Sequence, residues 1–162
     1  MNKVLIILLI PLIFMSCIQV EQRKNIKKTE EYYKVFSEGK NIEQFLDFYS
    51  DSDPIWNDAV SQSSYKNKEN IKNKCLSIWN DKEYEGSKTV SINQMLANDS
   101  IVVVNGHYNS YYYNNSKYDK VQFTAWLYFD KKNKIKKQVE WIQYPFEDLQ
   151  SIIIFNQNTQ IQ

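Results

Sequence analysis

Apolar residues recur at helical spacing soon after residue 25. Tyr32, Val35 and Phe36 fall on one face of the segment 26–38, and Gly39 follows where a left-handed residue commonly ends a helix. This spacing predicts a first helix over 26–38.

Two further segments repeat the helical period. Asn41 can cap a second helix, whose apolar face consists of Ile42, Phe45, Leu46 and Tyr49. A turn cluster at 51–54 ends this helix, and a short strand is predicted at 55–60. The apolar face of a third helix consists of Ile71, Cys75, Ile78 and Trp79.

From residue 88 onward, β-branched and aromatic residues alternate with polar ones, which is typical of strands. Candidate strands lie at 89–96, 101–113, 117–130 and 134–144. Helices followed by consecutive antiparallel strands predict an α+β domain in which the helices cover one face of a curved sheet.

The first seventeen residues have a different pattern. Lys3 precedes an apolar run, Val4 to Met15, that is shorter than the roughly 20 residues needed to span a bilayer and is typical of a cleavable signal peptide. Ser16 and Cys17 follow, and this ending resembles a lipobox, where lipoprotein signal peptidases cut. We therefore predict a lipid on Cys17 that anchors the protein to a bacterial membrane, outside the cytoplasm. The alternative is an ordinary signal peptide with a cysteine at its cleavage point.

These patterns divide the chain into four parts. Residues 1–16 form the signal peptide, and 17–24 comprise the lipidated cysteine and a linker with little apolar material. A single domain is expected over 25–155, in which Ile152–Phe155 is either a last short element or a docking segment. The polar residues 156–162 are expected to form a flexible tail.

The charge balance and the cysteine content make several candidate functions unexpected. Without Lys3 the mature chain has equal numbers of basic and acidic residues, so nucleic acid is not expected as a partner. A lipid on Cys17 leaves Cys75 without a disulfide partner. Cys75 is then a buried apolar residue or, alternatively, a catalytic thiol with His107 as its base.

No motif for cofactor chemistry occurs. The three glycines do not form a phosphate-binding loop, and neither a serine-hydrolase elbow nor a zinc-binding helix is present, so we expect no cofactor and no metal. His107 is the single histidine and is expected to be a hydrogen-bonded strand residue or a pocket acid or base. The basic run Lys131 to Lys137 is either a solvated turn or a surface that an anionic membrane attracts.

The order of elements resembles a known superfamily. The residues that carry the resemblance are 45–49, 53–56, 123–130 and 139–141. They are similar to the nuclear transport factor 2-like (NTF2-like or SnoaL-like) superfamily, and the likeness spans roughly 30–144. It implies a cone-shaped fold, with three N-terminal helices packed on a curved, mostly antiparallel sheet and an open end that holds a small apolar ligand. Members include ketosteroid isomerases, polyketide cyclases and dehydratases, and many members only bind.

The resemblance also implies roles for single residues. Asp58 matches the general base of the isomerases, and Tyr33 or Tyr32 matches the tyrosine that stabilises the enolate. The acid that assists this tyrosine corresponds to Ala125, which cannot donate a hydrogen bond. His107 would assist Asp58 as it does in dehydratases of the family.

Strand alternation then divides the sheet into two faces. If Ala125 faces the cavity, its strand neighbours Phe123 and Leu127 do so too. The expected pocket consists of Trp56, Trp79, Phe123, Leu127 and Trp141. The convex face would carry Gln138, Glu140 and Ile142, together with Trp126 and Tyr128 as candidate residues of a homodimer interface.

These residues predict a lipid-anchored binding module for a small apolar or amphiphilic ligand, without catalysis. The alternative is an isomerase, dehydratase or cyclase with Asp58 as general base.

Overall fold

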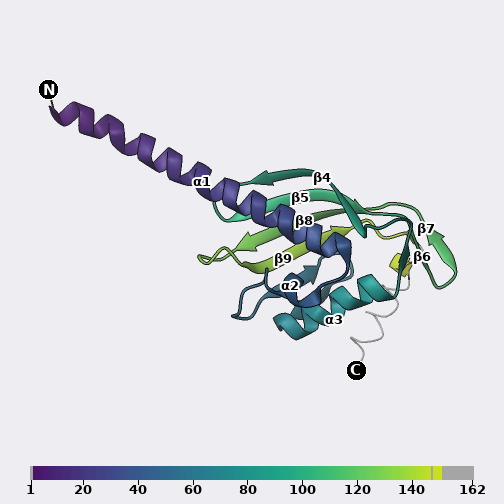
Figure 1. Ribbon diagram of the computed structural model, residues 1–162. Helices are drawn as coiled ribbons and strands as arrows, with labels where there is room; N and C mark the ends of the chain where they lie inside the picture. Colours follow the sequence, from purple (N-terminus) through teal and green to yellow (C-terminus); the bar gives the residue numbers. More distant parts are fainter. Residues whose placement is uncertain (1, 147, 151–162) are drawn as a thin grey trace.

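The computed structural model describes the backbone of residues 2–146 and 148–150 (Figure 1). In chain order, the elements are α1 (Asn2–Glu38), α2 (Ile42–Leu46), β1 (Ile55–Asp58), β2 (Ser63–Lys66), α3 (Asn67–Asn80), β3 (Glu83–Tyr84), β4 (Val90–Ala97), β5 (Ile101–Tyr108), β6 (Tyr111–Tyr113), β7 (Ser116–Tyr118), β8 (Val121–Phe129) and β9 (Ile135–Ile142). The predicted last element at 152–155 and the tail at 156–162 lie outside the described residues.

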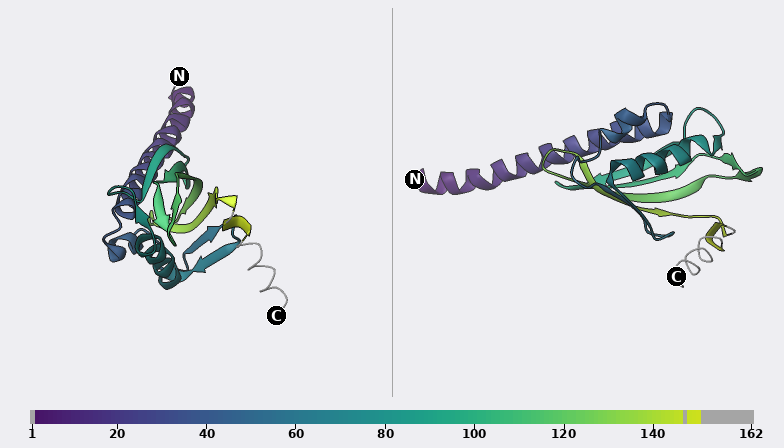
Figure 2. Two further views of the ribbon diagram at one scale, coloured as in Figure 1. Left: turned by 90° about the vertical axis from the view of Figure 1, so that its right-hand side faces the viewer. Right: turned by 90° about the horizontal axis from the view of Figure 1, so that it is seen from below.

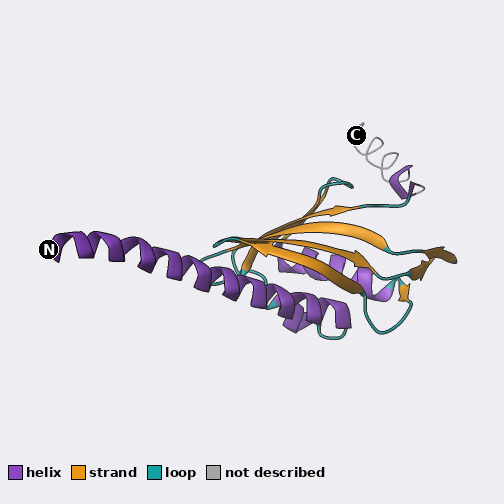
Figure 3. Ribbon diagram, turned by 90° about the horizontal axis from the view of Figure 1, so that it is seen from above, coloured by secondary structure: helices purple, strands orange, loops and turns teal. Residues whose placement is uncertain are grey.

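A six-stranded sheet in the order β2-β1-β9-β8-β5-β4 forms the main layer, and only the β1–β9 pair within it is parallel. The sheet curves over the helices, which lie along one of its faces (Figure 3). The predicted α+β class and the curved, mostly antiparallel sheet are confirmed. The strand expected between the second and third helices is present as β1, whereas β2 is additional, and Leu149 N–H donates to Pro145 O in a further turn after β9.

Two long predicted strands are each divided. The segment 101–113 breaks into β5 and β6, and 117–130 breaks into β7 and β8. β6 and β7 form a hairpin that pairs with β3 in a separate three-stranded sheet. Asn114 and Asn115 turn this hairpin with φ of 49° and 63°, a conformation that asparagine tolerates better than most residues.

α1 is one continuous helix that includes residues 17–24, where a linker without regular structure was expected. Its N-terminal part projects from the body, whereas its C-terminal part lies against the sheet (Figure 2). No helix within the described part of the chain has both the length and the apolar character that crossing a membrane requires. α1 ends at Glu38, and Gly39 follows with a φ of 61°, as predicted.

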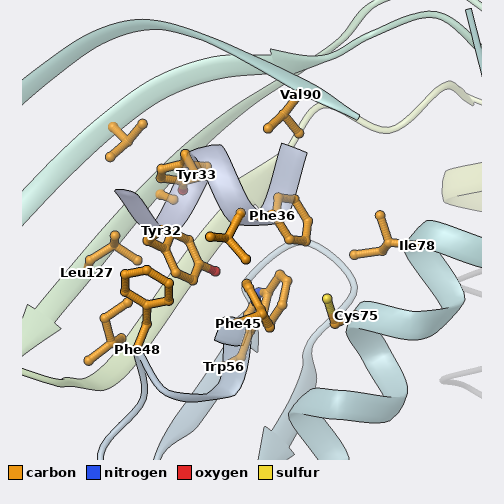
Figure 4. Close-up of a cluster of buried hydrophobic side chains, with 14 of the residues drawn as sticks. Tyr32, Tyr33, Phe36, Phe45, Phe48, Trp56, Cys75, Ile78, Val90 and Leu127 are labelled. Carbon is orange, nitrogen blue, oxygen red and sulfur yellow. The ribbon is translucent and has the colours of Figure 1, made fainter. Parts of the chain in front are cut away.

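An aromatic core fills the space between the helices and the sheet (Figure 4). Phe36 is at its centre, with ring centroids 5.5 Å from Phe45, 6.1 Å from Trp56 and 6.2 Å from Trp79. Rings at these distances favour tilted or edge-to-face packing, which adds about 1 kcal/mol per pair to their burial. Cys75 is buried beside them, and burial raises the pKa of its thiol, so it packs as a small apolar residue.

Candidate functional site

The register between β8 and β9 decides which side chains enter the cone. Ala125 lies opposite Glu140, and residues directly opposite in an antiparallel pair share a face. The inward residues of β9 are therefore Gln138, Glu140 and Ile142, all buried. The expectation that these three lie on the convex face is wrong.

Glu140 is the central polar residue of the cone. Its side chain is 2% exposed and accepts hydrogen bonds from Trp56 Nε1 at 3.2 Å and the Tyr108 hydroxyl at 3.3 Å. Burial raises the pKa of Glu140 to about 7; Asp58 adds to the shift, whereas Lys74 and the two hydrogen bonds oppose it. In the described part of the chain, no cation lies within ion-pairing distance of this carboxyl group. Glu140 can therefore bind or release a proton near neutral pH.

Asp58 lies beside Glu140 on the neighbouring parallel strand. Its Oδ1 accepts the backbone N–H groups of Val60 at 3.0 Å and Ser61 at 3.1 Å, and its Oδ2 accepts the Tyr144 hydroxyl. The side chain is 2% exposed. The predicted base is therefore inside the cone. Its carboxylate oxygens, however, accept hydrogen bonds from the loop after β1 and from the segment after β9.

The two candidate tyrosines of α1 have different surroundings. Tyr32 donates to Gln138 Oε1 at 2.8 Å, and Tyr49 donates to the same oxygen at 2.7 Å. Tyr33 is equally buried, with its ring 6.0 Å from that of Phe123, but its hydroxyl has no hydrogen-bond partner among the residues that the structure describes. An unpaired buried hydroxyl costs about 1–3 kcal/mol.

His107 lies away from this group. Its neighbours Gly106 and Tyr108 are buried toward the core, so alternation places His107 on the outer face of β5. Burial and the nearby Lys120 lower its pKa, against a hydrogen bond with Asn109. The structure does not bring His107 and Asp58 together.

The five residues of the expected pocket do not surround one cavity. Trp56, Phe123 and Leu127 are 1%, 2% and 0% exposed and pack into the core. Trp79 donates its Nε1–H to Phe36 O at 2.9 Å. Trp141 is 43% exposed on the convex face, because the register turns it away from the cone.

Trp126 and Tyr128 lie on the convex face, where alternation predicts them. The ring of Trp126 is 5.9 Å from that of Trp141 and 6.5 Å from that of Tyr128. A row of apolar side chains, formed by Leu96, Val103, Trp126 and Val139, crosses four neighbouring strands here. The role of Trp126 and Tyr128 in an interface stays a prediction.

A groove of about 530 Å³ lies between α1 and β4, within the usual size of ligand sites. Its apolar lining consists of Tyr33, Val90, Ile92 and Met95, and its charged lining consists of Glu30, Lys34, Glu38 and Lys88. Sequence alone does not indicate this site, because it requires the placement of α1 along the sheet edge. Tyr33 joins the groove to the core beside Glu140.

Comparison with known proteins supports the fold. No protein-family model matches the sequence, and no curated protein matches it significantly. A solved structure from Shewanella putrefaciens, assigned as a SnoaL-like polyketide cyclase, has 18% identity and a TM-score of 0.62 over 79% of this chain and 96% of that one. A steroid delta-isomerase from Pseudomonas aeruginosa has 11% identity and a TM-score of 0.57 over 80% and 85%. An NTF2-like protein of unknown function from Cytophaga hutchinsonii has 16% identity and a TM-score of 0.54 over 72% and 96%. The chain therefore has the NTF2-like fold, and identities this low carry no activity with them.

Proposed function

We propose that this chain is a lipid-anchored, extracytoplasmic NTF2-like domain that binds a small amphiphilic molecule in the groove between α1 and β4. The proposal rests on the side chains that line this groove. Its apolar side chains can receive a hydrocarbon body, while its charged side chains can receive a polar group.

The anchor rests on the apolar run that ends in Ser16-Cys17. Cells fed an alkyne-bearing fatty acid should label the wild-type protein and the Cys75→Ser variant, but not Cys17→Ser. Stable anchoring needs more than one acyl chain, so the intact mass should show the corresponding additions on Cys17. Equal labelling of Cys17→Ser and wild type would contradict the anchor.

Ligand binding can be measured with N-phenyl-1-naphthylamine, whose fluorescence rises in apolar surroundings. We expect the mature protein to bind this probe and dodecanoate to displace it. Met95 faces the groove, whereas the adjacent Leu96 is 63% exposed on the opposite face. Met95→Ser should weaken probe binding roughly fivefold, the effect of losing about 1 kcal/mol of apolar contact, and Leu96→Ser should not change it. The reverse order would place the probe on the convex face and contradict the groove.

A second function is favoured by Glu140, whose carboxyl group lies next to Asp58 with its pKa raised by burial to about 7. This value suits a group that removes a proton next to a carbonyl. For the alternative of an isomerase, dehydratase or cyclase, we therefore propose Glu140 in place of Asp58 as the proton acceptor, with Asp58 as its support.

The substrate for this test is 5-androstene-3,17-dione, because a steroid delta-isomerase shares the fold. An isomerase would convert it with a kcat/KM that rises through pH 7, and Glu140→Gln should lower the rate by roughly 100-fold or more. Asp58→Asn should act mainly on stability. Absence of conversion by the wild-type protein would contradict isomerase activity.

A further inference from the structure

One end of the body lies closest to the anchor. Asn25 Nδ2 of α1 donates to Asp99 O in the β4–β5 turn at 3.0 Å, and Phe129 N–H donates to Ser100 O at 2.8 Å. These contacts place the end of β8 beside the point where α1 meets the body. The β8–β9 turn accordingly lies on the side from which α1 projects (Figures 1 and 2). We call this region the tether end.

The β8–β9 turn gives the tether end exposed positive charge. Lys131, Lys132 and Lys136 are exposed, and within the described residues no carboxylate lies within ion-pairing distance of them. The acid of this turn, Asp130, directs its Oδ1 to the backbone N–H groups of Lys132 and Lys134 and its Oδ2 to the hydroxyl of Ser50. Its carboxylate is thus occupied within the fold.

The neighbouring elements do not reverse this charge. The loop 47–53 carries three acids, of which Asp51 is paired with Lys68 at 2.6 Å. α1 adds exposed cations at Arg23 and Lys27, between Cys17 and the core. The exposed Asp99 lies in the β4–β5 turn, and Glu21 of α1 is paired with Lys24 at 2.7 Å. With these two acids counted, basic side chains still outnumber acidic ones at the tether end, although the mature chain as a whole is neutral.

The length of the tether brings this charge close to the membrane. Eight residues of continuous helix from Cys17 to Asn25 measure about 12 Å. Electrostatic attraction extends about 8 Å at physiological ionic strength, and lysine side chains shorten the remaining distance. A lipid on Cys17 thus holds the turn within reach of the headgroups.

We infer that the tether end rests on an anionic lipid surface through Lys131 and Lys132, while Arg23 and Lys27 add positive charge along α1. This inference depends on the proposed lipid at Cys17. It assigns the β8–β9 turn a partner, the negatively charged headgroups of the membrane that holds the anchor, and it fixes which end of the cone faces the bilayer.

The experiment uses the full mature lipoprotein in vesicles of phosphatidylcholine, with or without phosphatidylglycerol. An uncharged acetylating reagent is added, and the rate of acetylation at each lysine is followed by mass spectrometry. Lys131 and Lys132 should react roughly threefold or more slowly on the anionic vesicles, and high salt should abolish the difference. Lys120 is the matched control, since it is exposed at the opposite end of β8, roughly 30 Å away.

A double variant, Lys131→Gln with Lys132→Gln, tests the same contact through the acetylation rate of Lys27, which lies on α1. In this variant Lys27 should react at the same rate on both kinds of vesicle. Equal acetylation of Lys131 and Lys132 on both vesicles would overturn the inference while leaving the anchor intact. In a flotation assay, a protein that rises with neither kind of vesicle would contradict both the anchor and this inference.

Discussion

Glu140 lies between Trp56 and Tyr108, and no described residue forms an ion pair with it, so the charged form is costly to hold in the core. Its pKa of about 7 in the folded protein lies above its ordinary value of 4.5 because of burial. The folded state therefore binds more protons than the unfolded chain between these two values. Because proton binding is linked to folding, this group contributes its full stabilisation below about pH 4.5. The contribution is lost as the pH rises through 7.

We therefore expect Glu140→Gln to remove a pH-dependent loss of stability. Between pH 5 and 8 the wild-type free energy of unfolding should fall by about 2.5 kcal/mol from this group, as 1.36 kcal/mol per pKa unit implies. The variant should show a flatter profile and exceed wild type at pH 8, because the Tyr108 hydroxyl can rotate to accept from the new amide. Urea unfolding across this range measures the effect.

Glu69→Gln is the control, since Glu69 is exposed on α3. It should leave the pH profile unchanged. If Glu140→Gln and Glu69→Gln give the same profile, the Glu140 carboxyl group is not the source of the dependence.

Single residues also show how far sequence predicts the site. The resemblance to the isomerases, rather than the strand pattern, implies a site position for Asp58, and the structure buries its side chain inside the cone. Its hydrogen bond from Tyr144 comes from 86 residues along the chain, which no local pattern indicates. Glu140 was assigned to the wrong face, because a charged residue between Val139 and Trp141 is normally the exposed member of the alternation.

At the scale of elements, the helical spacing of apolar residues predicts burial more reliably than the alternation along strands does. Tyr32, Val35 and Phe36 are buried as the spacing predicts, and the alternation of β8 holds from end to end. β9 differs because both of its faces carry apolar residues. Its register depends on an irregularity at Tyr128/Phe129 and on the bridge between Tyr49 and Ile135, both tertiary features.

The end of α1 offers a test of local backbone geometry. Gly39 has a φ of 61°, and a Cβ added there would lie 3.5 Å from the ring of Trp79, which is ordinary contact. The cost of Gly39→Ala should therefore come from the left-handed conformation alone, about 1 kcal/mol. We expect a lower urea midpoint with an unchanged m-value.

Glu38→Ala, one residue earlier and still helical, provides the comparison. It should change stability by less than about 0.5 kcal/mol. Equal losses at both positions would show that the backbone conformation of Gly39 is not the cause.

For the whole molecule, the convex face of the sheet exposes a row of apolar side chains that crosses several strands. Leu96 and Trp126 are 63% and 39% exposed, and Val103 and Val139 complete their row. Contiguous apolar surface of this kind commonly marks an interface. We expect the mature chain to form a homodimer through it.

Light scattering of the purified protein should give the mass of a dimer, and Trp126→Ala should shift it to that of a monomer. Tyr112→Ala is the matched control, because Tyr112 is a 44% exposed aromatic on β6, outside this face. A wild-type monomer, or a dimer that survives Trp126→Ala, would contradict the interface.

α1 is one unbroken helix from residue 17 into the core, so the length of this segment also sets the rotation of the body around the helix axis. Each residue inserted between Cys17 and Asn25 would lengthen it by about 1.5 Å and rotate the body by about 100° around its axis. Two added residues would turn Lys131 and Lys132 almost to the opposite side, whereas seven would nearly restore them. If Cys17 carries the proposed lipid, the number of residues between Cys17 and Asn25 would therefore set which side of the body faces the bilayer, and insertions of whole turns would preserve it.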